Sequence, residues 1–197
     1  MLYLASSSPR RAELLRQIGV EFDIIHADID ESPRKGEAID ELVSSLSIEK
    51  AIQGLQMVSD IRTHDLVLAA DTLIGLDGRI IGKPESKQHC CEILQLLSGK
   101  QHQVYSAVAL AGADGAVKER LTVNEITFRA LTEREIRQYC DGDEPMDKAG
   151  AYAIQGKAAM FIQHLSGSYS AVMGLPLYET ALLLDEAGYR ITGNKNL

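Results

Sequence analysis

Two arginines stand in the first turn of a predicted helix, within the segment ASSSPRRAELLRQIG. Ser8 followed by Pro9 is typical of a helix start, because serine can cap a backbone amide and proline needs no amide donor there. Arg10 and Arg11 then lie at the positive end of the helix dipole, which disfavours cations by about 0.3–1 kcal/mol. A strand, a serine-rich turn and a helix N-terminus together favour an anion, here one with several charges. The alternative is that both arginines are solvated or pair with the acidic loop 28–31.

A single aspartate, Asp71, follows the apolar run LVLAA of residues 66–70, which predicts a strand buried on both faces. We expect Asp71 at the carboxyl end of this strand, the edge where open α/β sheets bind ligands. A carboxylate there can hold a divalent cation or accept a proton from water. The alternative is a turn aspartate that only caps the end of the strand.

Two lysines could join this aspartate. Lys83, in GKP, follows a two-residue hairpin turn predicted at Asp77-Gly78 and could fold back toward Asp71. Lys50, in SIEKAI, lies on a helix predicted over about residues 38–59, whose other turns face the core. The alternative for Lys50 is a surface side chain that extends its ammonium into solvent.

Other chemistries find no support in the sequence. The five histidines show no zinc-ligand spacing, and they are His26, His64, His89, His102 and His164. The serines lack a GxSxG context, and neither a P-loop nor a GxGxxG motif is present. The formal net charge of −8 opposes broad nucleic-acid binding, although a small anionic substrate is compatible with it.

The chain as a whole is typical of one globular domain, residues 1–197. No apolar run approaches the ~18 residues of a membrane span, and the N-terminus does not resemble a signal peptide, so we expect a cytoplasmic protein without membrane contact. The three cysteines, Cys90, Cys91 and Cys140, lack metal-ligand spacing, and we expect them to be reduced thiols.

Strands and helices that would position these residues alternate in the first part of the chain, and antiparallel strands are predicted in the later part. Strands are predicted at 2–5, 66–70, 102–110, 118–131, 159–165 and 168–174, with a short one within 21–33. Helices are predicted from Ser8 to Gly19, over 38–59, 86–99 and 175–188, and after a capping box of Thr132 and Glu135. This order predicts an α/β fold with a central mixed β-sheet flanked by helices.

Five motifs, LASSSPRRAELL, EKA, LAADT, GKP and DKAGAYAIQG, together resemble the Maf family of nucleoside triphosphate pyrophosphatases. They occur in the order of that family across nearly the entire chain. The resemblance implies a mixed sheet with a deep cleft, similar to the inosine triphosphate pyrophosphatases. It also implies a divalent metal cofactor, Mg²⁺ or Mn²⁺, and homodimers are common in such a family.

The resemblance implies roles for the motif residues. The residues that it places around the substrate are Ser8, Arg10, Arg11, Glu31, Lys50 and Lys83. Asp71 corresponds to the catalytic proton acceptor, and Asp71 and Glu31 are the implied metal ligands. Asp30 stands beside Glu31, so the choice of carboxylate in this loop stays open.

Three positions narrow the substrate further. The branch that acts on 7-methyl-GTP has tryptophan, glutamine and glutamate where this chain has Arg10, Thr72 and Gln155. The chain therefore resembles the dTTP/UTP branch. The Gln155 amide can donate to a pyrimidine O4 and accept from N3–H, whereas glutamate could only accept.

The resulting interpretation is hydrolysis of dTTP and UTP, or of modified pyrimidine nucleotides, to the monophosphate and pyrophosphate. Two alternatives stay open. One is a nucleotide-binding regulator of cell division or septum formation without catalysis, and the other is an enzyme that removes inosine or xanthosine triphosphate. Asp71, Lys50 and Lys83 favour an enzyme, because a regulator needs no proton acceptor beside the phosphates.

Overall fold

The computed structural model describes residues 1–32 and 36–191, and the chain divides into two compact units. Unit 1 comprises Met1–Asp71, Ser106–Thr122 and Gly174–Leu197, and unit 2 comprises Thr72–Tyr105 and Val123–Met173. Because three segments of unit 1 alternate with two of unit 2, the chain passes between the units four times. The single domain 1–197 stays a prediction beside this division.

The strands form one mixed sheet in the order β2-β1-β3-β5-β6-β7, with β4 paired to β3. Their bounds are Leu2–Ala5 (β1), Asp23–Ile25 (β2), Leu66–Leu76 (β3), Arg79–Ile81 (β4), Gln101–Gly112 (β5), Val117–Phe128 (β6) and Ile162–Ser166 (β7). β1 runs parallel to β2 and β3, whereas β4 and β7 are antiparallel to their neighbours. The predicted α/β class with a mixed sheet is confirmed, and the deep cleft stays a prediction.

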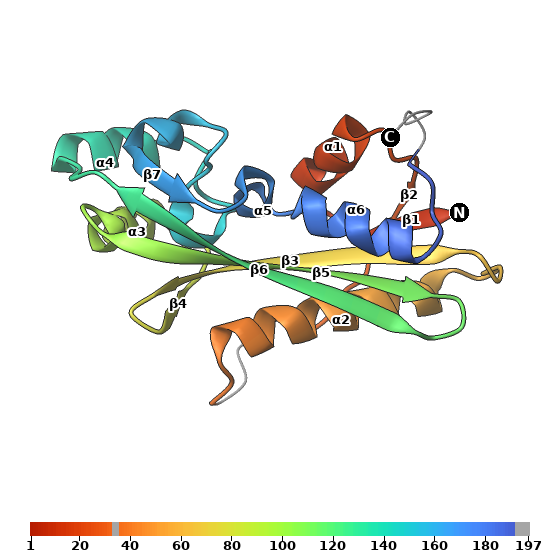
Figure 1. Cartoon of the computed structure of the whole chain (residues 1–197). Coiled ribbons are helices and arrows are strands. Elements are labelled where there is room, and N and C mark those ends of the chain that lie inside the picture. Colours follow the sequence, from red (N-terminus) through yellow and green to blue (C-terminus); the bar gives the residue numbers. More distant parts are fainter. Residues whose placement is uncertain (33–35, 192–197) are drawn as a thin grey trace. The chain divides into compact units, whose positions relative to one another are not determined.

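The described part of unit 1 contains the helices α1 (Pro9–Gln17), α2 (Ile39–Met57) and α6 (Leu177–Glu186). Figure 1 shows α2 on one face of the unit 1 strands and α1 and α6 on the other. α2 approaches the sheet closely at Gly54, where a Cβ would lie 2.9 Å from both the Ala5 Cβ and a Val67 methyl group. A larger residue there would push α2 away from β1 and β3.

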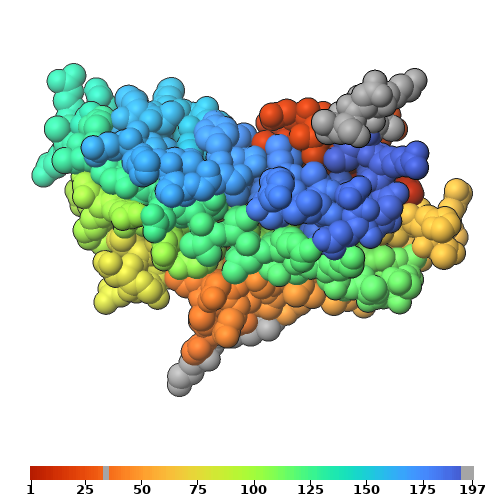
Figure 2. All heavy atoms as spheres, in the orientation of Figure 1, coloured from red at the N-terminus to blue at the C-terminus, as the bar shows by residue number. Residues whose placement is uncertain are grey.

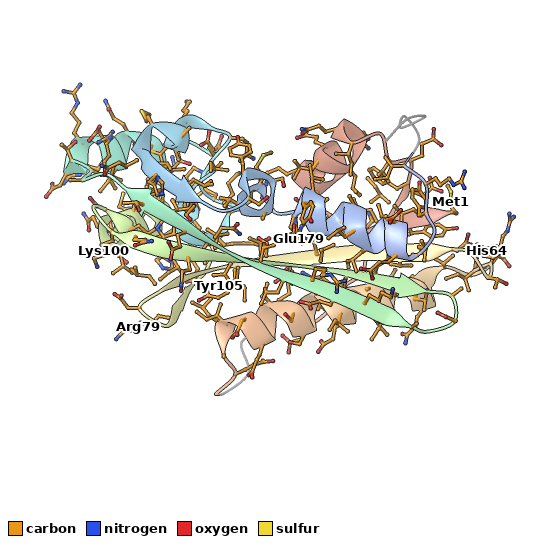
Figure 3. All side chains as sticks on the ribbon, viewed as in Figure 1. Met1, His64, Arg79, Lys100, Tyr105 and Glu179 are labelled. Atoms are coloured by element: carbon orange, nitrogen blue, oxygen red, sulfur yellow. A yellow bond between two sulfur atoms is a disulfide. The ribbon has the colours of Figure 1, made fainter. Side chains whose placement is uncertain are left out.

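Ion pairs join the ends of unit 1 elements. The N-terminal ammonium of Met1 donates to Asp65 at 2.8 Å, just before β3, and Figure 3 shows Met1 at the same end of the strands as His64. Lys118 and Arg120 on β6 both bind Glu186 at the end of α6. Figure 2 accordingly shows α6 lying against the β5–β6 hairpin at the surface.

Unit 2 holds α3 (Lys87–Leu97), α4 (Glu133–Cys140), α5 (Tyr169–Met173) and two short 3-10 helices, Ala149–Ala151 and Lys157–Phe161. A disulfide between Cys90 and Cys140 joins α3 to α4, with the Cα atoms 5.9 Å apart. The expectation of three reduced thiols is therefore wrong, and Cys91 alone remains a thiol. The pairing depends on the packing of α3 on α4, which cysteine spacing does not reveal.

Local signals mostly gave the right elements. Asp77 and Gly78 have positive φ values of 50° and 75°, as a type I′ hairpin requires, and Thr132 and Glu135 form the predicted capping box. Ser8 precedes α1 as predicted, but its side chain makes no capping hydrogen bond. The strand expected over 168–174 is wrong: α5 forms there, because the Ser168 hydroxyl accepts from the Ala171 amide and starts a helical turn.

No helix within residues 1–32 and 36–191 has the length and apolarity that crossing a bilayer requires.

A buried histidine lies in the unit 2 core. His102 on β5 is 2% exposed, its ring packs edge-on to Phe128, and its Nε2 lies 2.8 Å from the Tyr152 hydroxyl. Its Nδ1 is buried without a hydrogen-bond partner among the described residues. A charged imidazolium would therefore be poorly solvated, and burial lowers the pKa of His102 to about 4.

The lowered pKa of His102 predicts that the protein loses stability in mild acid. The unfolded state takes up the His102 proton near pH 6.5, whereas the folded state does so only near pH 4, so the free energy of unfolding falls as the pH drops between these values. We expect protonation of His102 in the unfolded state to lower the free energy of unfolding by about 2–3 kcal/mol between pH 7 and pH 4.5. Urea unfolding at pH 7 and 4.5 measures this, with His102→Gln as the comparison. If the free energy of unfolding depended on pH equally in the wild type and in His102→Gln, the prediction would be wrong.

Candidate functional site

A buried lysine holds two carboxylates together in unit 1. The Lys50 ammonium, on α2, donates to Asp71 Oδ1 at 2.7 Å and forms an ion pair with Glu31 Oε1 at 2.5 Å. Lys50 and Asp71 are each 7% exposed, whereas the Glu31 side chain is half exposed. The alternative of a solvent-extended Lys50 is therefore wrong, because its charged end faces the β3 carboxylate.

Asp71 lies within β3 and not at its end. The strand continues to Leu76, so both the strand-end position and the turn-cap alternative are wrong. β1, however, pairs with β3 only through Leu68 and ends at Ala5. Asp71 thus stands just beyond the carboxyl end of β1, where the parallel pairing stops. The sequence predicted a ligand-binding edge at the carboxyl end of β3. In the structure, the strand whose carboxyl end lies beside Asp71 is β1.

Arg11 points its guanidinium toward this aspartate. Its Nε donates to the Gly174 carbonyl at 2.8 Å, its Nη1 donates to Ser6 Oγ at 3.3 Å, and its Nη2 lies 4.0 Å from Asp71 Oδ1. The side chain is 12% exposed, so the solvated alternative is wrong for Arg11. Burial lowers the pKa of the Arg11 guanidinium, and the Asp71 charge acts in the opposite direction. Arginine stays protonated in either case.

The serine turn before α1 is ordered by its own hydrogen bonds. The Ser8 amide donates to Ser6 Oγ at 3.2 Å, and the Ser6 amide donates to the Ile25 carbonyl at 3.1 Å. The first turn of α1 contains no acidic residue that would repel an anion. Arg10 is half-buried on this turn, and phosphate binding by Ser8 and Arg10 stays a prediction.

Asp30 and Glu31, neighbours in the acidic loop 28–31, contact different groups. Asp30 Oδ1 accepts from the Ser32 amide at 2.9 Å, which stabilises the loop locally. Glu31 instead reaches Lys50. The contact with Lys50 brings the Glu31 carboxylate close to Asp71.

Asp71 and Glu31 contact the same Lys50 nitrogen, so the two predicted metal ligands lie close together. The described residues include no group of three or more His, Cys, Asp or Glu side chains able to hold a metal. Mg²⁺, however, is often bound through one or two carboxylates, waters and substrate phosphates. This donor set therefore fits a metal that arrives with a triphosphate.

The remaining predicted residues belong to unit 2. Thr72 follows Asp71 on β3, where successive side chains alternate between the two faces of the sheet. Lys83 and Gln155 are exposed. Their contributions to the site stay predictions. Sequence reasoning missed Ser6 and Gly174, the partners of Arg11; Ser6 lies in the quoted serine turn, but a backbone carbonyl 163 residues away carries no sequence signal.

Fold and site together define an α/β protein with a cluster of buried charges where its parallel strands end. The family model described as Maf-like protein matches residues 1–187, and the chain belongs to the Maf family. A dTTP/UTP pyrophosphatase of Aromatoleum aromaticum is 48% identical over 95% of this chain and 96% of its own length. One of Colwellia psychrerythraea is 47% identical over 95% of this chain and 89% of its own length.

Among solved structures, a nucleoside-triphosphatase described as a dITP/XTP pyrophosphatase, from Mycobacterium abscessus, aligns over 95% of both chains, with a TM-score of 0.48 and 15% identity.

Proposed function

We propose that this protein hydrolyses dTTP and UTP to the nucleoside monophosphate and pyrophosphate. The observation that carries the proposal is the Asp71 carboxylate, buried between the Lys50 ammonium and the Arg11 guanidinium. A proton acceptor flanked by cations suits attack by water on a phosphate chain. The relatives called dTTP/UTP pyrophosphatases, similar over nearly their full lengths, support the substrate.

In this mechanism the phosphate chain binds at the N-terminus of α1, against Ser8, Arg10 and Arg11. The oxygen of a water molecule bonds to the α-phosphorus while the bond from that phosphorus to the bridging oxygen breaks. Asp71 takes up the proton of the water, and pyrophosphate leaves. Lys50 orients Asp71 through their 2.7 Å hydrogen bond. Catalysis then consists mainly of positioning and charge stabilisation.

A divalent cation fits this scheme as a substrate-borne cofactor. Asp71 and Glu31 would hold Mg²⁺ or Mn²⁺ together with the phosphates, and the bound cation would neutralise developing negative charge. Since Lys50 already bonds both carboxylates, it keeps them close together before the nucleotide arrives.

Base selection falls to Gln155 in this proposal. Its carboxamide pairs with O4 and N3–H of uracil or thymine, and Thr72 and Arg10 mark the same branch. Lys83 would add a further cation for the phosphates. The cytoplasmic location, the homodimer and the lack of nucleic-acid binding stay predictions beside this activity.

A substrate panel tests the proposal. We expect pyrophosphate release from dTTP and UTP at a kcat/KM about tenfold or more above that for CTP, 7-methyl-GTP and ITP, in keeping with the relatives called dTTP/UTP pyrophosphatases. ITP is the most informative competitor, because its O6 and N1–H could also pair with the Gln155 amide. Release should stop with a chelator and return with Mg²⁺ or Mn²⁺. Preference for ITP would favour removal of purine nucleotides instead. Nucleotide binding without any turnover would favour the regulator.

A further inference from the structure

The segment that carries Gln155 is anchored through its backbone on both sides. Before Gln155, the Ala153 amide donates to the Tyr139 hydroxyl at 3.3 Å. After it, the Lys157 amide donates to Glu144 Oε2 at 3.2 Å. The Gly156 amide donates to the Ala153 carbonyl at 3.1 Å and closes the turn between them. Gln155 itself remains exposed at the tip of this turn.

A single carboxylate links the two anchors. Glu144 Oε1 accepts from the Tyr139 hydroxyl at 2.8 Å, while Oε2 accepts from Lys157. Burial, and then Glu144, raise the pKa of Tyr139, so its hydroxyl stays protonated and donates. The chain of hydrogen bonds thus runs from Ala153 through Tyr139 and Glu144 to Lys157. Both tyrosine and carboxylate must be in place to satisfy all three donors.

The glycine beside Gln155 is explained by the same carboxylate. A Cβ on Gly156 would lie 2.4 Å from Glu144 Oε1 and 2.5 Å from its Cδ. The carboxylate therefore occupies the space that any other residue at 156 would need. The start of the segment is fixed separately, since the Tyr152 hydroxyl bonds His102.

We propose that Glu144 is a specificity-determining positioning residue, which acts through Tyr139 and the turn backbone to hold Gln155 ready for a pyrimidine base. An exposed glutamine on a loose turn would lose much conformational freedom on binding, and a turn fixed beforehand avoids part of that cost. This inference rests on the proposed function, because it needs a substrate base for Gln155 to contact.

The base lies far along the nucleotide from the α-phosphorus. Interactions with it stabilise the bound substrate and the transition state alike, so their loss raises KM and leaves kcat nearly unchanged. Deoxyribose 5′-triphosphate carries no base and cannot contact Gln155 through one. Its KM and kcat should therefore not depend on the turn. Damage to the fold as a whole would instead impair both substrates.

Glu144→Gln is the decisive variant, since the amide keeps the shape but presents an NH₂ group to one of the two donors. We expect KM for dTTP and UTP to rise about tenfold, with kcat within about twofold and both constants unchanged for deoxyribose 5′-triphosphate. Asp143→Asn is the matched control: it removes one charge from the adjacent, exposed residue and should behave as the wild type.

Tyr139→Phe provides a second test, because it removes the hydroxyl and leaves Glu144 in place. It should raise KM for dTTP and UTP in the same selective way. The inference is overturned if Glu144→Gln and Tyr139→Phe, both with the wild-type thermal midpoint, keep the wild-type KM, or if KM rises equally for the base-free substrate. A wild type that releases no pyrophosphate from dTTP or UTP would overturn the proposed function first.

Discussion

Asp71→Asn is expected to lower kcat for dTTP and UTP hydrolysis by about a thousandfold, the contribution typical of a positioned proton acceptor. The asparagine amide has nearly the shape of the carboxylate but cannot take a proton from water at neutral pH. Its oxygen can still accept from Lys50, as Asp71 Oδ1 does at 2.7 Å. The variant should therefore fold, and its defect should lie in turnover.

Steady-state kinetics with dTTP, together with calorimetry of dTTP binding, separates the two effects. Asp65→Asn is the matched control, since Asp65 is also buried, also pairs with an ammonium and immediately precedes β3. It should keep the wild-type kcat. A kcat near the wild-type value in Asp71→Asn would remove Asp71 from the mechanism, whatever its effect on nucleotide binding.

The sequence could supply the residue types of this site but not their contacts. Lys50, Asp71 and Glu31 come from a helix, a strand and a loop. Lys50 and Asp71 each had a purely structural alternative when considered alone, and Glu31 was indicated only by the family resemblance. The motifs indicated that these residues work together, because they match a family pattern in order. The Lys50 bridge between two carboxylates, and the Gly174 carbonyl that holds Arg11, are long-range contacts that no spacing encodes.

The helices, strands and turns likewise divide into those fixed by neighbouring residues, which the sequence predicts, and those that depend on long-range contacts. The Asp77-Gly78 turn and the capping box of Thr132 and Glu135 depend on a few neighbouring residues, and both were predicted. Residues 168–174 were predicted to form a strand, yet α5 forms. There the Ser168 hydroxyl caps a helical turn, and Asn124 of β6 accepts from the Ser168 amide. A tertiary contact thus supports the helix, and the local sequence does not reveal that contact.

Breaking the disulfide between Cys90 and Cys140 is expected to lower the free energy of unfolding by about 4 kcal/mol. The bond joins residues 50 apart, and closing a loop of that length restricts the unfolded chain by this amount in the chain-entropy model. Cys90 and Cys140 are also almost fully buried where α3 packs on α4, so the folded state holds the sulfurs together.

Urea unfolding with and without a reductant measures the effect in the wild type. The Cys90→Ala/Cys140→Ala variant carries no such bond, so its stability should not respond to the reductant. Cys91→Ala is the matched control, since it removes the neighbouring thiol and should lose as much stability on reduction as the wild type. Alkylation of the denatured, unreduced wild type should modify Cys91 alone, and modification of all three cysteines would contradict the bond. Cys140 follows Tyr139 directly on α4, and the Tyr139 hydroxyl accepts from the Ala153 amide of the Gln155 turn. Reduction therefore also tests whether the disulfide supports this turn. A selective rise in KM for dTTP on reduction would show that it does.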